Sequence, residues 1–183
     1  MREQIIQNWK YASTFYNGIV FAMRTKSGQG NSGVDDRGAT HFLPPDVSNR
    51  ELGAALIDCL EQSRFILDVD YQAFFNTAED KRNERSWRDA RVKNMGVKSY
   101  SQLRQQLANV GVDMIDDILM LQPSNNLFGR DWLYFNDGRR EEKDIKMPYP
   151  NDPAAIGAAL REAFKRCEGT GRDALVFPEP QPD

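Results

Sequence analysis

One pattern occurs twice in this chain, 104 residues apart, and the repeat limits the possible folds more than any other feature. Residues 43–56 read LPPDVSNRELGAAL, and residues 147–160 read MPYPNDPAAIGAAL. In each copy an extended segment stops at prolines, a polar residue can cap a helix, and apolar residues then recur at helical spacing. Gly53 and Gly157 each cost about 1 kcal/mol relative to alanine inside a helix. Their presence in both copies predicts that each helix closely approaches a neighbouring backbone.

The fold class follows from the elements that these patterns predict. The repeats predict two similar helices at about 50–64 and 153–167, and a charge-dense helix is predicted near 80–95. Runs of strand-forming residues, separated by turn signals such as Asn17-Gly18, lie at 8–16, 19–25, 40–43, 109–114, 118–122, 132–135 and 143–147. Strands in hairpins with helices between them predict an α+β fold with a mainly antiparallel sheet, against which the two similar helices pack.

Domain organisation is predicted to be simple. We expect a single domain over 1–183, with the strand–proline–helix repeat at 40–64 and 143–167 and a loose C-terminal tail at 170–183. The glycine-rich segment 27–33 lacks the Gly-Lys-Ser/Thr ending of a phosphate loop and is interpreted as a flexible hairpin tip. Residues 123–126 are predicted to be a loop, and Asp70 is predicted to cap a helix.

Composition narrows the choice of function. The formal net charge is −3 and the pI is about 5.3, whereas domains that bind nucleic-acid phosphates are more often basic. No apolar run approaches the ~20 residues of a membrane span, and the N-terminus lacks a signal peptide's apolar core, so we expect a cytoplasmic protein without membrane contact. Cys59 and Cys167 fall on the apolar faces of the repeated helices and are expected to be buried, reduced thiols.

Candidate catalytic groups are few. The single histidine, His41, could act with Asp35 or Asp36 in a small hydrolase, but a structural histidine is the preferred interpretation. Adjacent acids at 35–36 and 116–117 are interpreted as solvated turns, and the basic run 81–93 as a salt-bridged helix because acids are interleaved with it. The sequence therefore predicts no catalytic residues, no metal site, no cofactor and no enzyme. A nucleic-acid-binding module that uses sheet aromatics and the 81–93 run remains the alternative.

Several motifs occur in one order that is similar to a known family. They are GVDDRG at 33–38, HFLPPD at 41–46, ELG at 51–53, Trp87, MGVKS at 95–99, the strand at 118–123, Trp132 and IGAAL at 156–160. From about 10 to 168 this order resembles the immunity proteins of bacterial contact-dependent growth inhibition, the CdiI type. The resemblance implies a protein that binds and neutralises the C-terminal toxin domain of its cognate CdiA protein, often a nuclease, and so protects the producing cell. The family has no catalytic residues that could be transferred to this sequence, and the resemblance does not show which residues bind the toxin.

An acidic inhibitor can be steered onto the basic cleft that a nuclease needs for its substrate. On this basis we select an acidic and aromatic stretch as the candidate toxin-binding set: Asp113, Asp116, Asp117, Trp132, Tyr134, Asp137, Glu141 and Glu142. The alternative for any one of these residues is that Trp132 belongs to the core and the carboxylates are merely solvated.

Overall fold

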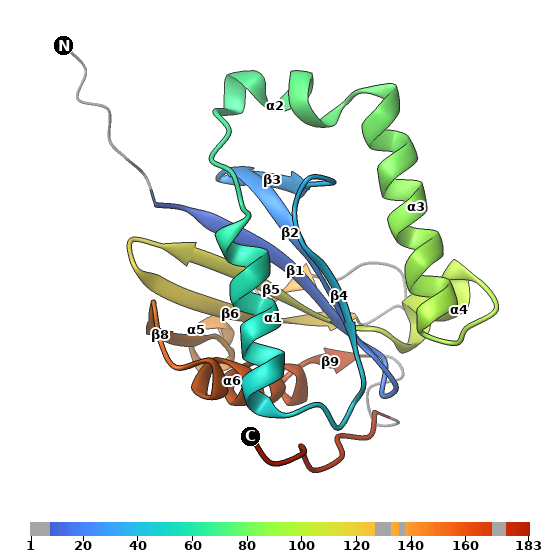
Figure 1. Ribbon diagram of the computed structural model, residues 1–183, viewed down its shortest axis with the longest axis vertical. Helices are drawn as coiled ribbons and strands as arrows, with labels where there is room; N and C mark the ends of the chain where they lie inside the picture. Colours follow the sequence, from blue (N-terminus) through green and yellow to red (C-terminus); the bar gives the residue numbers. More distant parts are fainter. Residues whose placement is uncertain (1–7, 127–132, 136–137, 170–174) are drawn as a thin grey trace.

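A computed structural model describes residues 8–126, 133–135, 138–169 and 175–183 of the chain (Figure 1). The strands are β1 (Lys10–Tyr16), β2 (Phe21–Gln29), β3 (Asn31–Val34), β4 (Thr40–Leu43), β5 (Ala108–Ile115), β6 (Ile118–Asn126), β7 (Leu133–Tyr134), β8 (Ile145–Pro148) and β9 (Glu168–Gly169). The helices are α1 (Asn49–Glu61), α2 (Asp68–Phe75), α3 (Ala78–Asn94), α4 (Tyr100–Gln106), α5 (Arg140–Lys143) and α6 (Pro153–Lys165). The predicted α+β class is confirmed.

The sheet consists of two similar halves. Its strand order includes β4-β2-β1-β5-β6-β8, and β1 and β5 form the antiparallel pair at the centre. In each half a hairpin is followed by a strand that pairs with the hairpin's second strand, and then by a helix: β1, β2, β4 and α1, or β5, β6, β8 and α6. The two halves are therefore arranged as if related by a two-fold axis between β1 and β5, and α2, α3 and α4 are inserted between them.

Both repeated helices lie on the same face of the sheet (Figure 1). Because side chains alternate along a strand, Ala12 and Tyr16 of β1 point to this face, while Phe15 points to the other. The predicted helical stripes are confirmed, since they are fully buried in the main core: Leu52, Leu56, Cys59 and Leu60 of α1, and Ile156, Leu160 and Phe164 of α6.

The two glycines of the repeat lie where α1 and α6 cross. A Cβ atom on Gly53 would lie 1.8 Å from the carbonyl oxygen of Pro153, and one on Gly157 would lie 1.9 Å from the carbonyl oxygen of Asn49. Asn49 and Pro153 are themselves equivalent positions of the repeat, so the contact is reciprocal. Each glycine thus directs a Cα hydrogen at a carbonyl of the other helix, a weak but favourable contact. The predicted close backbone approach is confirmed, and its partner is the other copy.

The opposite face of the sheet is partly covered by α3 and α4. A second core cluster there contains Phe15, Ala22, Trp87, Met95, Leu103 and Leu107. Thr77 and Asp80 form a capping box at the start of α3, and the chain leaves this helix through Gly96, whose φ is 66°. The charged helix predicted near 80–95 is confirmed by α3.

Segment 27–33 is a hairpin tip, as interpreted, but its residues pair with one another in a regular ladder, and the loop predicted at 123–126 is wrong. Segment 27–33 is a tight ribbon in which β2 turns into β3 at Gly30, and the Gly28 N–H donates to the Arg64 carbonyl (3.0 Å). Segment 123–126 continues β6, since Asn125 pairs with both β7 and β9.

Two further expectations differ from the structure. The helix α2 begins at Asp68 after Leu67 without a side-chain cap, so Asp70 lies within it and the predicted cap is wrong. The C-terminal tail was expected to be loose, yet in its described part, 175–183, the Phe177 ring lies 5.0 Å from Tyr16 and the Gln181 N–H donates to the Asp46 carbonyl (2.8 Å). An aromatic residue and backbone hydrogen bonds attach this segment to the core.

Both cysteines are buried thiols, as predicted. Burial, together with the nearby charge of Asp58, raises the pKa of Cys59 to about 12, which keeps this thiol protonated and unreactive at neutral pH. No helix among the described residues has the length and apolar character needed to cross a membrane.

We predict that Gly53→Ala and Gly157→Ala each destabilise the protein by about 1–3 kcal/mol, although alanine is the better helix former, because the added methyl group collides with a carbonyl oxygen. The double variant should lose less than the sum of the two single losses, since one widening of the crossing relieves both collisions. Urea unfolding measures these differences. Ala54→Gly, at an exposed position of α1, is the control and should cost only about 0.5–1 kcal/mol.

Candidate functional site

The structure divides the predicted toxin-binding set. Asp116 and Asp117 form the exposed β5–β6 turn, with φ values of 51° and 61°, while Glu141 and Glu142 are exposed on α5. Asp113 and Tyr134 instead lie together on the sheet face opposite α1 and α6. Trp132 and Asp137 lie outside the described residues. The predicted set is therefore three separate groups on the described surface.

Asp113 and Tyr134 lie beside each other at β5 on this sheet face, within reach of Arg140 from α5. A Cβ atom on Gly111 would lie 2.3 Å from the Tyr134 hydroxyl, so the ring rests directly on the β5 backbone. Burial raises the pKa of Asp113, and the neighbouring Lys26 and Arg140 oppose that rise. With its amide oriented to satisfy both neighbours, Gln122 donates to Asp113 (3.1 Å) and accepts from Arg140. Asp113 is thus part of a polar network rather than a bare acidic patch.

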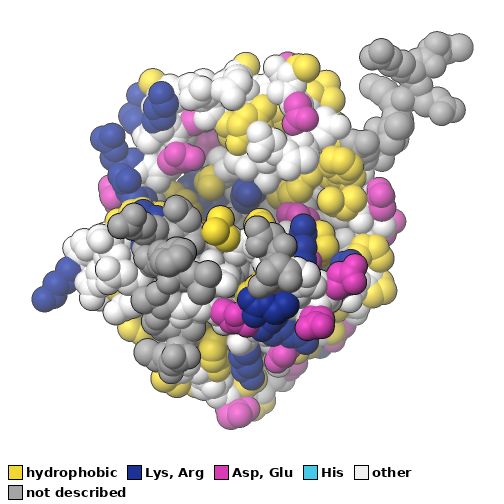
Figure 2. Space-filling model, turned by 180° about the vertical axis from the view of Figure 1, so that it is seen from behind, with side chains coloured by type: hydrophobic (Ala, Val, Ile, Leu, Met, Phe, Trp, Pro, Cys, Tyr) yellow, Lys and Arg dark blue, Asp and Glu magenta, His cyan; other side chains and the backbone are white. Residues whose placement is uncertain are grey.

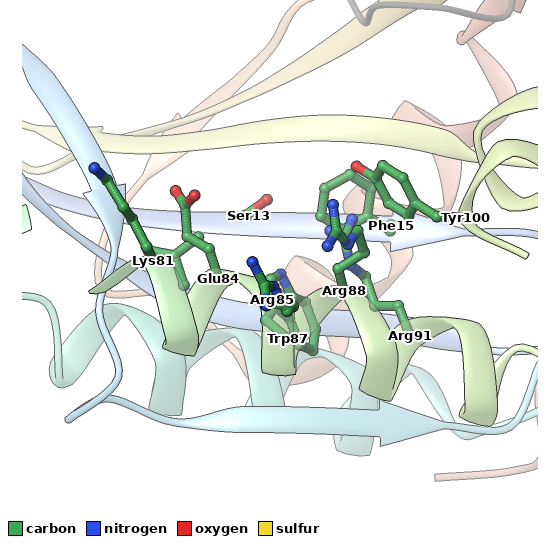
Figure 3. Close-up of a pocket in the computed structure, with 10 residues that line it drawn as sticks. Ser13, Phe15, Lys81, Glu84, Arg85, Trp87, Arg88, Arg91 and Tyr100 are labelled. Atoms are coloured by element: carbon green, nitrogen blue, oxygen red, sulfur yellow. The ribbon is translucent and has the colours of Figure 1, made fainter. Parts of the chain in front are cut away.

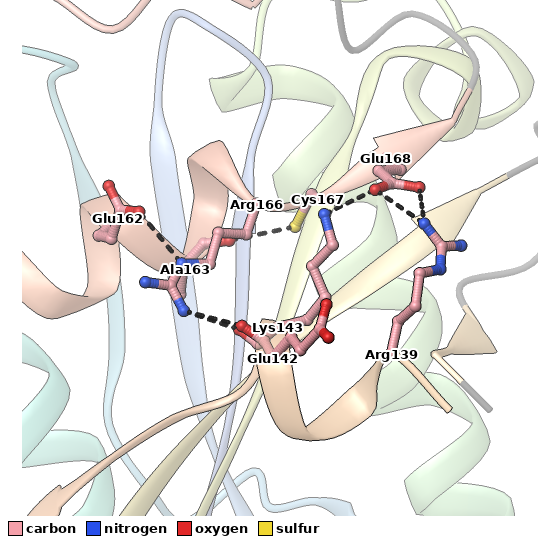
Figure 4. A network of polar contacts seen from close by, with 8 residues as sticks. All are labelled: Arg139, Glu142, Lys143, Glu162, Ala163, Arg166, Cys167 and Glu168. Atoms are coloured by element: carbon pink, nitrogen blue, oxygen red, sulfur yellow. Dashed lines mark hydrogen bonds and ion pairs between the residues drawn. The ribbon is translucent and has the colours of Figure 1, made fainter. Parts of the chain in front are cut away.

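Cations compensate the acids of the α5 region. Arg139 and Lys143 both contact Glu168, at 3.0 and 2.6 Å, and Arg166 contacts Glu162 at 3.0 Å (Figure 4). Arg166 also donates to the carbonyl oxygen of Glu142 (3.4 Å). Four cations thus lie near Glu141 and Glu142, but the ion pairs of these cations are with Glu168, Asp144 and Glu162: Arg139, Arg140, Lys143 and Arg166.

The hydrolase arrangement considered as an alternative for His41 does not assemble. His41 Nε2 lies 2.7 Å from Asp58 Oδ2, whereas Asp35 binds Arg64 (2.7 Å) and Ser27 (2.6 Å). Asp36 accepts a hydrogen bond from Asn83 (2.8 Å). Neither acid that could have oriented His41 contacts it, so the pair His41–Asp58 is best explained as a link between β4 and α1.

A cleft of about 450 Å³ separates α3 from the sheet. From α3 it is lined by Lys81, Glu84, Arg85, Trp87, Arg88 and Arg91, and these side chains project toward Ser13 and Phe15 of β1, with Tyr100 at one end (Figure 3). Figure 2 shows Lys and Arg side chains gathered along the α3 side of this face, with a hollow beside them. Four cations and one carboxylate make the cleft strongly basic, although the whole chain is acidic.

Arg91 is the most unusual residue of the cleft. Its side chain is only 6% exposed, and the guanidinium lies 4.5 Å from the Phe15 ring and 5.0 Å from the Trp87 ring. Burial lowers the pKa of Arg91; the Tyr100 hydroxyl opposes that shift, while Arg88 and Arg24 add to it. Within the described part of the chain, Nε and Nη1 of Arg91 have no hydrogen-bond acceptor.

The sequence analysis missed this cleft, because the run 81–93 was interpreted as a solvated, salt-bridged helix. One signal was available: Trp87, Arg91 and Met95 are spaced four residues apart, so they share one face of α3. Two members of that row are apolar and buried, which makes a buried arginine between them predictable.

Comparisons with known proteins agree with this architecture. A family model described as CDI immunity protein, CdiI, matches residues 10–167. The chain belongs to this family. The immunity protein CdiI-YPIII of Yersinia pseudotuberculosis serotype O:3 (strain YPIII) is 26% identical over 171 residues, which cover 87% of this chain and 96% of that protein. The family consists of immunity proteins, in agreement with the prediction of a binding protein rather than an enzyme.

Two solved structures have the same fold. A protein of unknown function from Neisseria meningitidis, NMB0488, superposes with a TM-score of 0.75 at 25% identity, over 87% of this chain and 95% of that chain. A chain of the CdiA-CT/CdiI toxin and immunity complex from Yersinia pseudotuberculosis superposes with a TM-score of 0.75 at 22% identity, over 87% and 97%. The predicted family resemblance is thus confirmed.

We predict that Asp35→Asn lowers stability at pH 7 by about 1–3 kcal/mol, because it weakens the buried hydrogen bonds to Arg64 and Ser27. Burial alone would raise the pKa of Asp35, but hydrogen bonds from Arg64, Ser27 and the Arg37 N–H hold it below its usual value. The pKa of Asp35 is therefore lower in the folded protein than the value of about 3.9 expected for the unfolded chain. The ionised carboxylate stabilises the fold fully above that unfolded-state pKa, and this stabilisation is lost as the pH falls through the folded-state pKa.

Unfolding free energies measured between pH 3 and pH 7 check this prediction. The gap between wild type and Asp35→Asn should close toward the acid end of the series. Asp36→Asn, at the exposed neighbouring position, should follow the wild type throughout. A gap that stays constant with pH would show that the Asp35 charge contributes nothing.

Proposed function

We propose that this protein binds and neutralises the C-terminal toxin domain of a cognate CdiA-type effector in the cytoplasm, and so protects the cell that produces both. The match of the CdiI family model to residues 10–167 carries this proposal. It is supported by the fold shared with a chain of the Yersinia toxin and immunity complex. We further propose that the toxin is a nuclease with a basic substrate cleft, which an immunity protein of net charge −3 would approach favourably.

The toxin-binding surface, in this proposal, is the sheet face opposite α1 and α6. That face presents Tyr134, whose side chain is 44% exposed, beside the network of Asp113. A large aromatic side chain next to buried polar groups is typical of the centre of an interface. Asp116, Asp117, Glu141 and Glu142 then lie around this centre and contribute mainly to the association rate. Trp132 and Asp137 remain proposed contacts from the sequence.

Nucleic-acid binding is the second candidate, because the cleft brings basic and aromatic residues together. Its rings, however, are occupied: Trp87 is 4% exposed and Phe15 is 7% exposed, and guanidinium groups lie over both. Single-stranded nucleic acids bind through bases that stack on accessible rings. The cleft therefore suits a small anionic group better than a base.

The decisive experiment is calorimetric binding to the toxin domain encoded next to this gene, with toxicity measured in parallel. We expect nanomolar affinity, with loss of toxin activity at equimolar immunity protein. A failure to bind, or binding without protection, would refute the proposal. Salt-sensitive binding of single-stranded DNA or RNA in place of toxin would favour the second candidate.

We predict that the double variant Asp116→Asn, Asp117→Asn slows association with the toxin by about two- to fivefold at low salt and flattens its salt dependence. Asparagine is chosen because both residues have positive φ, which asparagine tolerates. Stopped-flow fluorescence gives the rates. The control Glu51→Gln, Glu162→Gln removes the same charge from α1 and α6, on the other side of the sheet, and should leave the association rates nearly unchanged. Equal rates for all three proteins would remove the β5–β6 turn from the binding surface.

A further inference from the structure

We infer that the cleft between α3 and the sheet is a receptor for a carboxylate, and that an Asp or Glu side chain of the toxin domain inserts there onto Arg91 and Arg88. The inference rests on the proposed function, which supplies the toxin as the partner. It adds the chemistry of one anchoring contact and the residues that form it.

The first observation is the state of the Arg91 guanidinium. Its burial removes water from the N–H donors, yet Nε and Nη1 meet no acceptor among the described residues. Buried donors of native proteins are nearly always paired, and an unpaired charged donor is costly. Aromatic faces at 4.5 and 5.0 Å offset part of that cost, but they accept no conventional hydrogen bond. Among the described residues the Tyr100 hydroxyl is the side-chain acceptor that Arg91 has, so the guanidinium keeps donors that an acceptor entering the cleft could pair.

The second observation is the accumulation of like charge. Arg24 is 9% exposed, its guanidinium lies 5.5 Å from the Trp87 ring on the sheet side, and its Nε also lacks an acceptor among the described residues. Arg88 reaches the Tyr100 ring at 5.3 Å, and both Arg88 and Arg24 are close enough to disfavour the charge on Arg91. Arg88 and Arg91 both line the cleft and repel each other, and one anion between these two groups would turn that repulsion into attraction.

The third observation concerns size and chemistry. A cleft of about 450 Å³, open beside α3, admits a side chain. Of its described rings, Phe15 and Trp87 are buried, and the half-buried Tyr100 ring has the guanidinium groups of Arg88 and Arg91 at 5.3 and 5.6 Å, which leaves little room for a stacked base. A guanidinium binds a carboxylate through two parallel hydrogen bonds, which is the strongest geometry available to it. Since the chain belongs to a family of immunity proteins, an acidic side chain carried by a toxin is the occupant that fits both the charge and the shape.

The test compares toxin binding by Arg91→Gln, Arg91→Lys and Arg88→Gln. Breaking one partner of a buried charge pair should weaken binding by about 30-fold or more for Arg91→Gln. Arg91→Lys keeps the positive charge but cannot donate two parallel hydrogen bonds to one carboxylate, so it should weaken binding by about tenfold. Arg88→Gln should weaken binding to a similar extent. The control is Arg82→Gln, an exposed position of α3 that does not line the cleft, with a change below about twofold. Thermal unfolding of each free variant verifies folding, and Arg88→Gln keeps the test valid if Arg91→Gln does not fold.

A second arm identifies the source of the anion. Each Asp and Glu of the toxin domain is replaced by alanine and measured against wild type and Arg88→Gln in double-mutant cycles. For one toxin acid, the loss of affinity caused by its alanine substitution should be at least about fivefold smaller with Arg88→Gln than with the wild-type immunity protein. Inorganic phosphate, tested at constant ionic strength, should compete only weakly with the toxin.

The outcomes separate the two proposals. Tight binding of wild-type protein, with Arg91 and Arg88 variants that bind equally tightly, would overturn the carboxylate site and leave the immunity function intact. Tight phosphate binding that depends on Arg91, without any coupled toxin acid, would overturn it in favour of a small-anion site. No toxin binding by the wild-type protein would overturn the proposed function and this inference together.

Discussion

The crossing of α1 and α6 at Gly53 and Gly157 is the contact on which the rest of the structure depends. Each glycine leaves room for a carbonyl oxygen of the other helix, so the two helices pack with their backbones almost touching. That closeness allows both helices to fit on one face of a six-strand path, where their stripes fill a single core. Arg161 reinforces the arrangement from α6, because its guanidinium donates to Asn49 (3.0 Å) and to the Pro45 carbonyl (2.8 Å) before α1.

The same crossing determines which surface remains for function. With both repeated helices on one side, the described residues that pack on the opposite sheet face come mainly from α3 and α4 of the inserted segment. The insertion brings a row of cations to β1, and it keeps a desolvated arginine there whose Nε and Nη1 have no acceptor among the described residues. A protein selected only for stability would fill that position with an apolar side chain. Retaining a charge there is a cost that a binding partner can offset.

The sequence predicted the parts of the fold that depend on local pattern. Helical stripes, the Ser48 cap, Pro153 at the start of α6 and the Asn17-Gly18 turn are encoded within a few residues, and the structure has all of them. The repeat even predicted the close helix approach. The extension of β6 through 123–126 could not be predicted, because its partners are distant in sequence, at Leu133 and Glu168. The ribbon at 27–33 pairs within itself, but the backbone contact of Gly28 with Arg64 that anchors it is also distant.

The functional site, like the fold, could be predicted from the sequence only in part. The family resemblance indicated an immunity protein but carried no contact residues, and the acidic set was chosen from charge and composition alone. Charge along a sequence does not show how side chains are grouped: Glu141 and Glu142 lie among cations, and the basic run becomes the lining of a cleft only when Phe15 and Tyr100 complete it. The net charge shows that the whole chain is acidic, but it does not show that the α3 cleft is basic.

The central claim is that the toxin binds the sheet face opposite α1 and α6 and places a carboxylate in the α3 cleft. A crystal structure of the complex with the cognate toxin domain tests it most directly. The account predicts toxin contacts at Tyr134 and in the cleft, with an Asp or Glu of the toxin within hydrogen-bonding distance of Arg91. A toxin seated on the outer surface of α1 and α6, with the cleft empty, would contradict it.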